Sequence, residues 1–163
     1  MTKENKELLL KDLCSRLPYG VICEGKYSDA EYDIDGGIEM FDAHGVLEAI
    51  SMDETVINSY CCDIETVKPY LRPMSNMTEE EAKEMCKTVC SYDKITSLQI
   101  ISDRVRYGIL YNGSFNHVTL FFNKIYSLKQ LDWFLAHHLD YRGLIPKGLA
   151  IEVTEKNNPY ERI

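Results

Sequence analysis

The sequence predicts an α+β fold with a mainly antiparallel sheet and about three helices. Apolar and polar residues alternate at strand spacing in several short runs, while helical spacing is confined to a few separate segments. Two of those segments begin with a helix-capping pattern, and one Asn-Gly pair marks a β-hairpin. At 163 residues, with 45% hydrophobic and 27% charged residues, the chain can enclose one core. We therefore predict a single domain over residues 1–163.

A first helix is predicted over residues 4–17. Its apolar residues recur at helical spacing, and Pro18 with Gly20 ends the pattern. We expect the helix to pack through one apolar stripe. The stripe consists of Leu9, Leu10, Leu13, Cys14 and Leu17.

Short strands fill the rest of a β-rich first half that extends to about residue 66. Alternation of apolar residues with acids over residues 30–35 is typical of a strand with one solvated face. Gly36-Gly37 and His44-Gly45 are turn signals between strands. The runs of strand length are 21–23, 30–35, 38–41, 46–52 and 56–62.

A connector, residues 67–77, leads into a second half built as helix, hairpin and helix. Pro69 and Pro73 favour extended or turn conformations in this connector. A helix is then predicted over residues 78–90, where Thr78 and Glu81 have the spacing of a capping box.

A hairpin and a third helix complete the predicted second half. The pair Asn112-Gly113 predicts a tight turn between two of its strands. The third helix is predicted over residues 127–140, beginning at a second capping box and ending at Gly143 as its cap. The strands of this half are predicted over residues 95–101, 105–111, 115–122 and 150–153.

The acidic residues are concentrated in one segment. Between Glu24 and Glu65 the chain has twelve acids and one lysine, a charge of −11, which leaves +3 on the rest of a chain with net charge −8. Such a field repels nucleic acid and attracts basic partners, so we predict no nucleic-acid partner. Two interpretations stay open, a solvated strand face and a recognition surface. The predicted acidic face consists of Asp29, Glu31, Asp33, Asp35 and Glu39.

Two patterns resemble metal sites, and neither predicts one. Residues 31–42 match an EF-hand loop at its third, fifth, sixth and eighth positions, but Glu31 and Asp42 are the wrong acids for its two ends. Two cysteine pairs lack the knuckle spacing of structural zinc sites. These pairs are Cys61-Cys62 and Cys86 with Cys90. We predict no metal and no cofactor, and expect the six cysteines to be free core thiols.

No stretch predicts export or membrane insertion. The three leucines at residues 8–10 are too few for a signal peptide. No run approaches the roughly 20 apolar residues of a membrane span. We expect a cytoplasmic protein, because a reducing compartment keeps thiols free.

The densest group of functional side chains follows the third helix. An imidazole near a carboxylate can act as a general base, and an arginine beside it can hold a phosphate or carboxylate. The same residue types also stabilise the exposed carbonyls of a helix end. The candidate binding residues, here and in the connector, are Lys68, Tyr70, Arg72, Ser75, His137, His138, Asp140, Tyr141, Arg142 and Lys147.

Three segments together carry a family resemblance. Residues 68–81 read KPYLRPMSNMTEEE, residues 132–150 read DWFLAHHLDYRGLIPKGLA, and a Leu-Pro-Tyr-Gly turn over residues 17–20 follows the first helix. They resemble a family of small uncharacterised proteins that recurs in gut-bacterial genomes, their phages and mobile elements. The acidic stretch matches that family least. The resemblance implies a phage or mobile-element context, in which small proteins often block a host protein or sequester a signalling molecule.

Three hypotheses about function follow. The first is a non-enzymatic binding protein of phage or mobile-element origin, which engages the basic surface of a host protein through its acidic sheet face. The second is a pocket for a small anionic ligand such as a nucleotide, formed by the basic candidate residues. The third is a hydrolase that uses His137, His138 and Asp140. The sequence specifies no oligomeric state.

Overall fold

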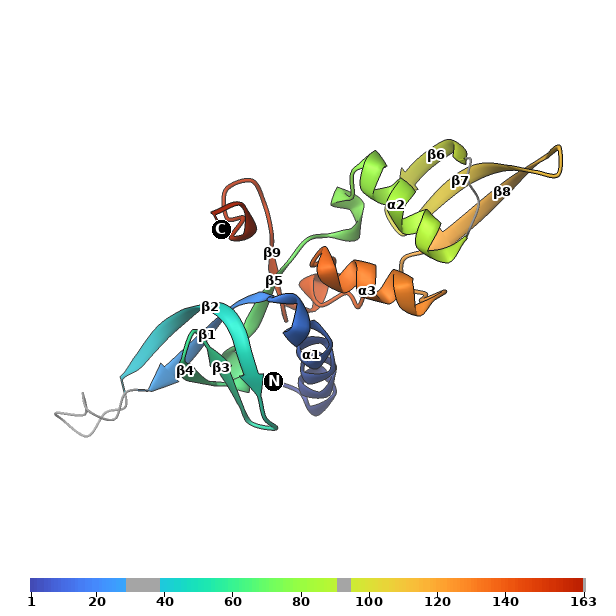
Figure 1. The fold of residues 1–163 in the computed structure, drawn as a ribbon. Helices are drawn as coiled ribbons and strands as arrows, with labels where there is room; N and C mark the ends of the chain where they lie inside the picture. Colours follow the sequence, from blue (N-terminus) through green and yellow to red (C-terminus); the bar gives the residue numbers. More distant parts are fainter. Residues whose placement is uncertain (29–38, 91–94, 163) are drawn as a thin grey trace. The chain divides into compact units, whose positions relative to one another are not determined.

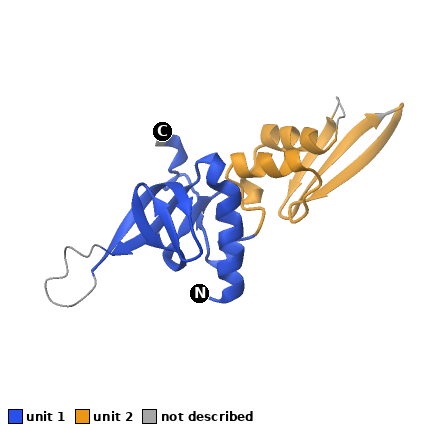
Figure 2. Cartoon of the chain, turned by 60° about the horizontal axis from the view of Figure 1, so that its bottom comes forward, with its two compact units in different colours: residues 1–71, 143–163 blue, residues 72–142 orange. Residues whose placement is uncertain are grey.

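The chain folds into two compact units. The structure, a computed structural model, describes residues 1–28, 39–90 and 95–162. Residues 1–71 and 143–163 form unit 1, and residues 72–142 form unit 2 (Figure 2). Both units combine helices with mainly antiparallel sheets, so the predicted α+β class is confirmed. The single domain stays a prediction, and the end of the chain belongs with the first half.

Unit 1 begins with helix α1 (Lys3–Arg16), which a Thr2 side chain caps and a 3₁₀ turn over Leu17–Tyr19 follows. The predicted first helix is confirmed, and its stripe is buried at Leu9 and Leu13. Cys14 is exposed, contrary to prediction. Asp12 and Arg16 occupy the buried side instead, because they neutralise each other there.

Six strands of unit 1 form one curled sheet, which is antiparallel from β4 to β5 (Figure 1). The order is β4-β3-β2-β1-β5-β9, and β9 runs parallel to β5. The strand β1 also contacts β4, so the sheet closes around an aliphatic core. A Cβ added at Gly25 of β1 would lie 3.0 Å from Ile57 and 3.1 Å from Val67. The strands are β1 (Ile22–Ser28), β2 (Met40–Ile50), β3 (Glu54–Ile57), β4 (Tyr60–Asp63), β5 (Lys68–Leu71) and β9 (Ile151–Glu152).

Two sequence predictions about this sheet are wrong. The strand β2 continues through His44-Gly45, which was predicted to be a break. The predicted strand over residues 56–62 is a hairpin, in which β3 and β4 are joined by Asn58 and Ser59 at φ 48° and 71°. Both turn residues are left-handed, as a two-residue hairpin loop requires, although neither is glycine.

Unit 2 packs two helices beside a three-stranded antiparallel sheet of order β6-β7-β8 (Figure 1). The Thr78–Glu81 capping box is present with both of its hydrogen bonds. Asn112 and Gly113 form the predicted turn at φ 48° and 75°. The elements are a 3₁₀ turn (Met74–Asn76), α2 (Glu79–Val89), β6 (Ile95–Ile101), β7 (Arg104–Tyr111), β8 (Ser114–Phe121) and α3 (Leu128–Ala136).

The helix α3 ends at Ala136, four residues before its predicted end. His138 takes the left-handed conformation at φ 53°, and the N–H of Leu139 donates to the carbonyl of Phe134 at 3.0 Å. The N–H of His138 donates to Leu135 at 3.1 Å. These two bonds form a Schellman motif, so Gly143 is not the cap as predicted.

The last segment of the chain returns to unit 1. Leu144, Leu149 and Ala150 join its core, and β9 pairs with β5. The Tyr160 hydroxyl accepts from the N–H of Ile22 at 3.3 Å and donates to the carbonyl of Tyr70 at 2.8 Å. The remaining 3₁₀ turns are Ile64–Thr66, Ile145–Lys147 and Tyr160–Arg162. Among the helices of the described residues, none has the length and apolar character to cross a membrane.

Candidate functional site

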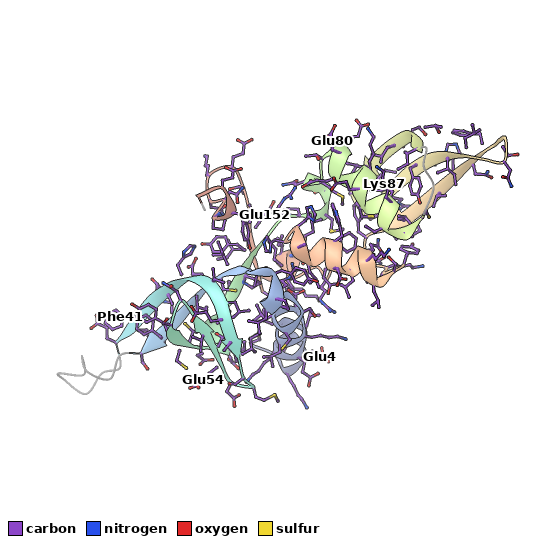
Figure 3. The ribbon with its side chains drawn as sticks, in the orientation of Figure 1. Glu4, Phe41, Glu54, Glu80, Lys87 and Glu152 are labelled. Atoms are coloured by element: carbon purple, nitrogen blue, oxygen red, sulfur yellow. The ribbon has the colours of Figure 1, made fainter. Side chains whose placement is uncertain are left out.

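Unit 1 has an acidic groove of about 480 Å³ on the outer side of its curled sheet. Residues from α1 and from the strands β1 to β4 line it, and Figure 3 labels Glu54 on β3 and Phe41 on β2. Four carboxylates and two ammonium groups give the lining an excess of negative charge. These are Asp53, Glu54, Asp63 and Glu65, with Lys6 and Lys26.

Two carboxylates of the groove oppose each other. Glu54 and Asp63 are paired in register across the β3–β4 hairpin, on the face away from the core. Like charges at directly opposite positions repel, which destabilises the pair. A cation placed between them would relieve that repulsion.

The other two acids of the groove already hold cations. The Lys6 ammonium donates to Asp53 at 2.7 Å, and this hydrogen bond raises the pKa of Lys6. Glu65 accepts from the N-terminal amino group at 3.2 Å. Both contacts are at the surface, where ion pairs exchange readily with solvent and salt.

The lining of the groove includes one aromatic ring, that of Tyr27. Tyr27 lines the groove and stacks on Tyr60, with ring centroids 4.4 Å apart. Phe41 lies 5.7 Å from the Tyr27 ring on the other side. Tyr60 keeps 44% of its surface exposed. Tyr27 lines the groove together with Glu54 and Asp63, and a lysine or arginine side chain can bind a ring and an acid together.

A thiol also lies in the groove. Cys61 is exposed, and loss of hydration together with a hydrogen bond to Glu54 raises its pKa. The group is therefore a neutral thiol at neutral pH and a poor nucleophile. In contrast, Cys23, Cys62 and Cys86 are buried as predicted.

The centre of the predicted acidic face is not part of the described structure. Asp29, Glu31, Asp33 and Asp35 lie outside the described residues, as does most of the EF-hand-like segment. Glu39 is exposed just before β2. In the described part of the chain, no group of three or more His, Cys, Asp or Glu is placed to hold a metal ion.

Two predicted binding residues, Lys68 and Tyr70, lie on β5 of unit 1. Glu24 is paired in register with His44 on one side and Lys68 on the other. The Tyr70 hydroxyl donates to Glu24 at 2.7 Å, and burial with this bond raises the pKa of Tyr70 to about 12. A small pocket of about 290 Å³ adjoins them, where His44 and Tyr70 meet Lys156. The pairing of Glu24 with His44 and Lys68 cannot be seen in the sequence, because it depends on strand register.

The predicted residues Arg72 and Ser75 belong to unit 2. The Arg72 guanidinium donates to both carboxylate oxygens of Glu81, at 2.7 and 2.8 Å. This pair lowers the pKa of Glu81. Ser75 is exposed in a 3₁₀ turn. Lys147 is exposed in unit 1, so the structure divides the predicted pocket residues between the units.

The predicted cluster at the end of α3 makes mainly structural contacts in unit 2. His137 stacks on Trp133 at 3.9 Å, and its Nδ1 lies 2.8 Å from the Trp133 carbonyl. The N–H of Asp140 donates to the Arg72 carbonyl at 2.8 Å. Tyr141 stacks on Phe134 at 5.8 Å.

The Arg142 guanidinium lies 4.8 Å from the Tyr141 ring centroid. Together with the Schellman motif at His138 and the bridge between Arg72 and Leu139, the contacts of His137, Asp140 and Tyr141 stabilise the end of α3 and its pairing with Arg72.

No family model, no curated protein and no solved structure matches this chain. The fold and its surfaces therefore define the class of protein. It is an α+β protein of two compact units, and unit 1 has an acidic groove that the Tyr27 ring helps to line.

Proposed function

We propose that unit 1 is a non-enzymatic binding module, which holds a lysine- or arginine-rich segment of a partner protein in its acidic groove. The observation that carries this proposal is the opposition of Glu54 and Asp63 in a groove that the Tyr27 ring also lines. The repulsion between two carboxylates disfavours the free groove and is relieved by a bound cation.

The groove suits a peptide segment better than a lone ion. It extends from Lys6 of α1 to the β3–β4 hairpin, and the side chains of Tyr27 and Met40 in its lining offer apolar contact that an inorganic ion does not use. Lys6 and Lys26 at its margins would pair with polar or acidic groups of the same segment. The resemblance to phage and mobile-element proteins makes a cytoplasmic protein of the bacterial host the expected source of the segment.

A peptide-binding measurement tests the proposal. An arginine-rich decapeptide labelled with fluorescein would be titrated with the full chain, and its affinity followed by anisotropy. The double variant Glu54→Gln with Asp63→Asn should weaken binding by about tenfold, because two surface charge contacts are lost. Added salt should weaken the wild-type complex, since the contacts are exposed.

A matched control removes the same charge elsewhere on unit 1. Glu155→Gln with Glu161→Gln neutralises two exposed acids outside the groove. This variant should bind the peptide like the wild type. Equal loss in both double variants would show attraction to net charge alone, and no loss in the groove variant would exclude the groove.

The thiols give a second readout on the same complex. Cys61 lines the groove, whereas Cys14 is exposed on α1 away from the groove lining. The bound peptide should slow the labelling of Cys61 by a thiol reagent and leave Cys14 unaffected. Unchanged labelling of Cys61 in the saturated complex would place the peptide elsewhere.

A second candidate function rests on the small pocket beside β5. His44 and Lys156 there can each supply a positive donor, and no carboxylate lines the pocket. This composition favours a small anion such as phosphate. Titration with inorganic phosphate should shift the His44 resonances in an NMR spectrum, and Lys156→Gln should weaken that shift. Equal shifts in both proteins would exclude this pocket.

A further inference from the structure

The three-stranded sheet of unit 2 has two different faces. Val105, Tyr107 and Ile109 of β7 are buried on one face, and the Tyr107 hydroxyl lies 3.1 Å from Cys90 at the end of α2. The alternate residues of β7 point to the other face, which no described helix of unit 2 covers (Figure 1). This outer face is therefore available to a partner.

Aromatic side chains gather on the outer face of β8. Phe115 is 54% exposed, and its ring meets the His117 ring edge-on at 4.8 Å. Further along the strand, the Arg104 guanidinium lies 4.7 Å above the Phe121 ring, and the Lys124 ammonium lies 5.5 Å from it. Register places these residues in one row, because Gly108 opposes His117 and Arg104 opposes Phe121.

Gly108 determines how the Phe115 ring lies. A Cβ at this position would be 2.6 Å from the Phe115 ring and 2.6 Å from the Ser97 hydroxyl. The absence of a side chain at Gly108 thus lets the ring lie across β7 close to the backbone. The edge strand β8 thus presents the Phe115 ring on the open face, over Gly108 of its one neighbour β7.

The charge of this region is opposite to that of the chain. Residues 95–126 contain Arg104, Arg106 and Lys124 against Asp103 as the one acid, a net charge of +2 in a chain of −8. Asp103 binds Arg104 at 2.7 and 2.8 Å, so Arg106 and Lys124 supply the excess. Arg106 lines a shallow pocket of about 320 Å³ with His117 and Gln99.

We propose that this outer face binds single-stranded nucleic acid. Exposed rings on a sheet face stack on unpaired bases whatever their sequence, and neighbouring cations contact the phosphates. Gln99 and Ser97 supply hydrogen-bonding groups for base edges in the pocket of Arg106. An acidic protein would use the cations but would gain little from a flat ring beside them, and duplex bases are stacked within the helix, where Phe115 cannot reach their faces.

Anisotropy titrations of the full chain with labelled oligonucleotides test this site. Oligothymidylate and oligouridylate of about 15 nucleotides would be used at low salt, because phosphate contacts weaken as salt rises. Both should bind, because stacking on an exposed ring requires only unpaired bases. Phe115→Ala should weaken binding by about tenfold, which corresponds to 1.4 kcal/mol.

Two further variants separate stacking from charge. Arg106→Gln should weaken binding and reduce the slope of affinity against salt by about one, the effect of one lost phosphate contact. Leu128→Ala changes a 78% exposed side chain on α3 of the same unit and should leave binding unchanged. Circular dichroism should show the wild-type fold in all three variants, since each side chain is at the surface.

Competition decides between a nucleic acid and a polyanion in general. An abasic oligonucleotide and polyglutamate carry the charge without bases, so both should compete poorly with oligothymidylate. Equal competition by polyglutamate would assign the face to an acidic protein and overturn the proposal. Lack of any binding, or wild-type affinity in Phe115→Ala, would overturn it as well.

Discussion

The two sheets of this protein use their faces in different ways. Unit 1 has nine basic and eighteen acidic residues, a net charge of −9, and its sheet curls around a closed aliphatic core. Unit 2 has nine basic and eight acidic residues, a net charge of +1, and its sheet leaves one aromatic face uncovered. The net charge of a whole chain is an average, and the partner that each face attracts depends on the local charge.

The units also differ in how they accommodate an ion pair. In unit 1 the Asp12–Arg16 pair is fully buried, with an Nε–Oδ2 distance of 2.6 Å. In unit 2 the Arg72–Glu81 pair is 25% and 20% exposed. Burial removes water from a charge, so loss of one partner costs far more in unit 1 than in unit 2.

Asp12→Asn should have the largest effect on stability. It leaves the Arg16 guanidinium buried without its carboxylate, which should lower the free energy of unfolding of unit 1 by about 3–5 kcal/mol. Urea denaturation would be followed by labelling of the buried Cys23 in unit 1 and by fluorescence of Trp133, the single tryptophan, in unit 2. We expect the first transition to shift and the second to stay.

A simultaneous shift of both transitions would contradict the comparison and show one cooperative domain. Asp12→Leu combined with Arg16→Met serves as the control. It removes both buried charges and should recover most of the lost stability, because apolar pairs of similar volume often replace buried ion pairs without cost.

Substitution of one glycine in each unit should have effects of intermediate size on stability. Gly25→Ala places a methyl group against Ile57 and Val67 in a closed core, and should destabilise unit 1 by about 1–3 kcal/mol. Gly108→Ala meets the ends of three side chains, the Phe115 ring at 2.6 Å and the hydroxyls of Ser97 at 2.6 Å and Thr96 at 2.9 Å. These side chains lie on an uncovered face and can move aside, so the substitution should cost less stability.

The two glycine variants should also differ in binding. Gly108→Ala displaces the Phe115 ring and should weaken oligonucleotide binding, whereas Gly25→Ala should leave it unchanged. Melting curves and anisotropy on both variants measure the two effects. The reverse pattern, with Gly108→Ala the less stable protein, would show that the face of unit 2 is packed and not open.

The smallest expected effect is the loss of the Arg72–Glu81 ion pair at low pH. Glu81 has a lowered pKa in the folded state because Arg72 donates to it, so its contribution is present above the usual value of 4.5 and is lost as pH falls below it. Glu81→Gln should lower the stability of unit 2 by about 1–2 kcal/mol at neutral pH, given its partial exposure. The urea midpoints of wild type and variant, from Trp133 fluorescence, should converge as the pH falls below 4.5 through the lowered pKa of Glu81. A constant difference between them would contradict the assignment.

The helices could be predicted because their signals are local. Thr78 and Glu81 lie within one turn, and the predicted starts of all three helices differ from the observed ones by one residue. The end of α3 could not be predicted, because His138 takes a conformation that a sequence assigns to glycine. The turn at Asn58-Ser59 could not be predicted for the same reason, because both residues take the left-handed conformation without being glycine.

The surfaces depend on strand register, which the sequence does not display. Glu54 and Asp63 belong to the acidic segment of the sequence, but their pairing depends on the turn at Asn58-Ser59 between β3 and β4. The outer face of unit 2 required the register of Arg104 with Phe121. The prediction of no nucleic-acid partner stays untested, and it rests on a sum of charges over residues that the fold places in separate units.

The path of the chain also determines the order in which parts of the two units are synthesised. Unit 1 is left at Leu71 and resumed at Gly143, so the whole of unit 2 emerges from the ribosome before β9 exists. That interval is on the order of ten seconds at ordinary rates of synthesis. During it β5 is the edge of the nascent sheet, and Pro69 in that edge has no N–H to offer a foreign strand. The segment that follows unit 2, in which the Tyr160 hydroxyl bonds to Ile22 and Tyr70, then completes the sheet that began to form first.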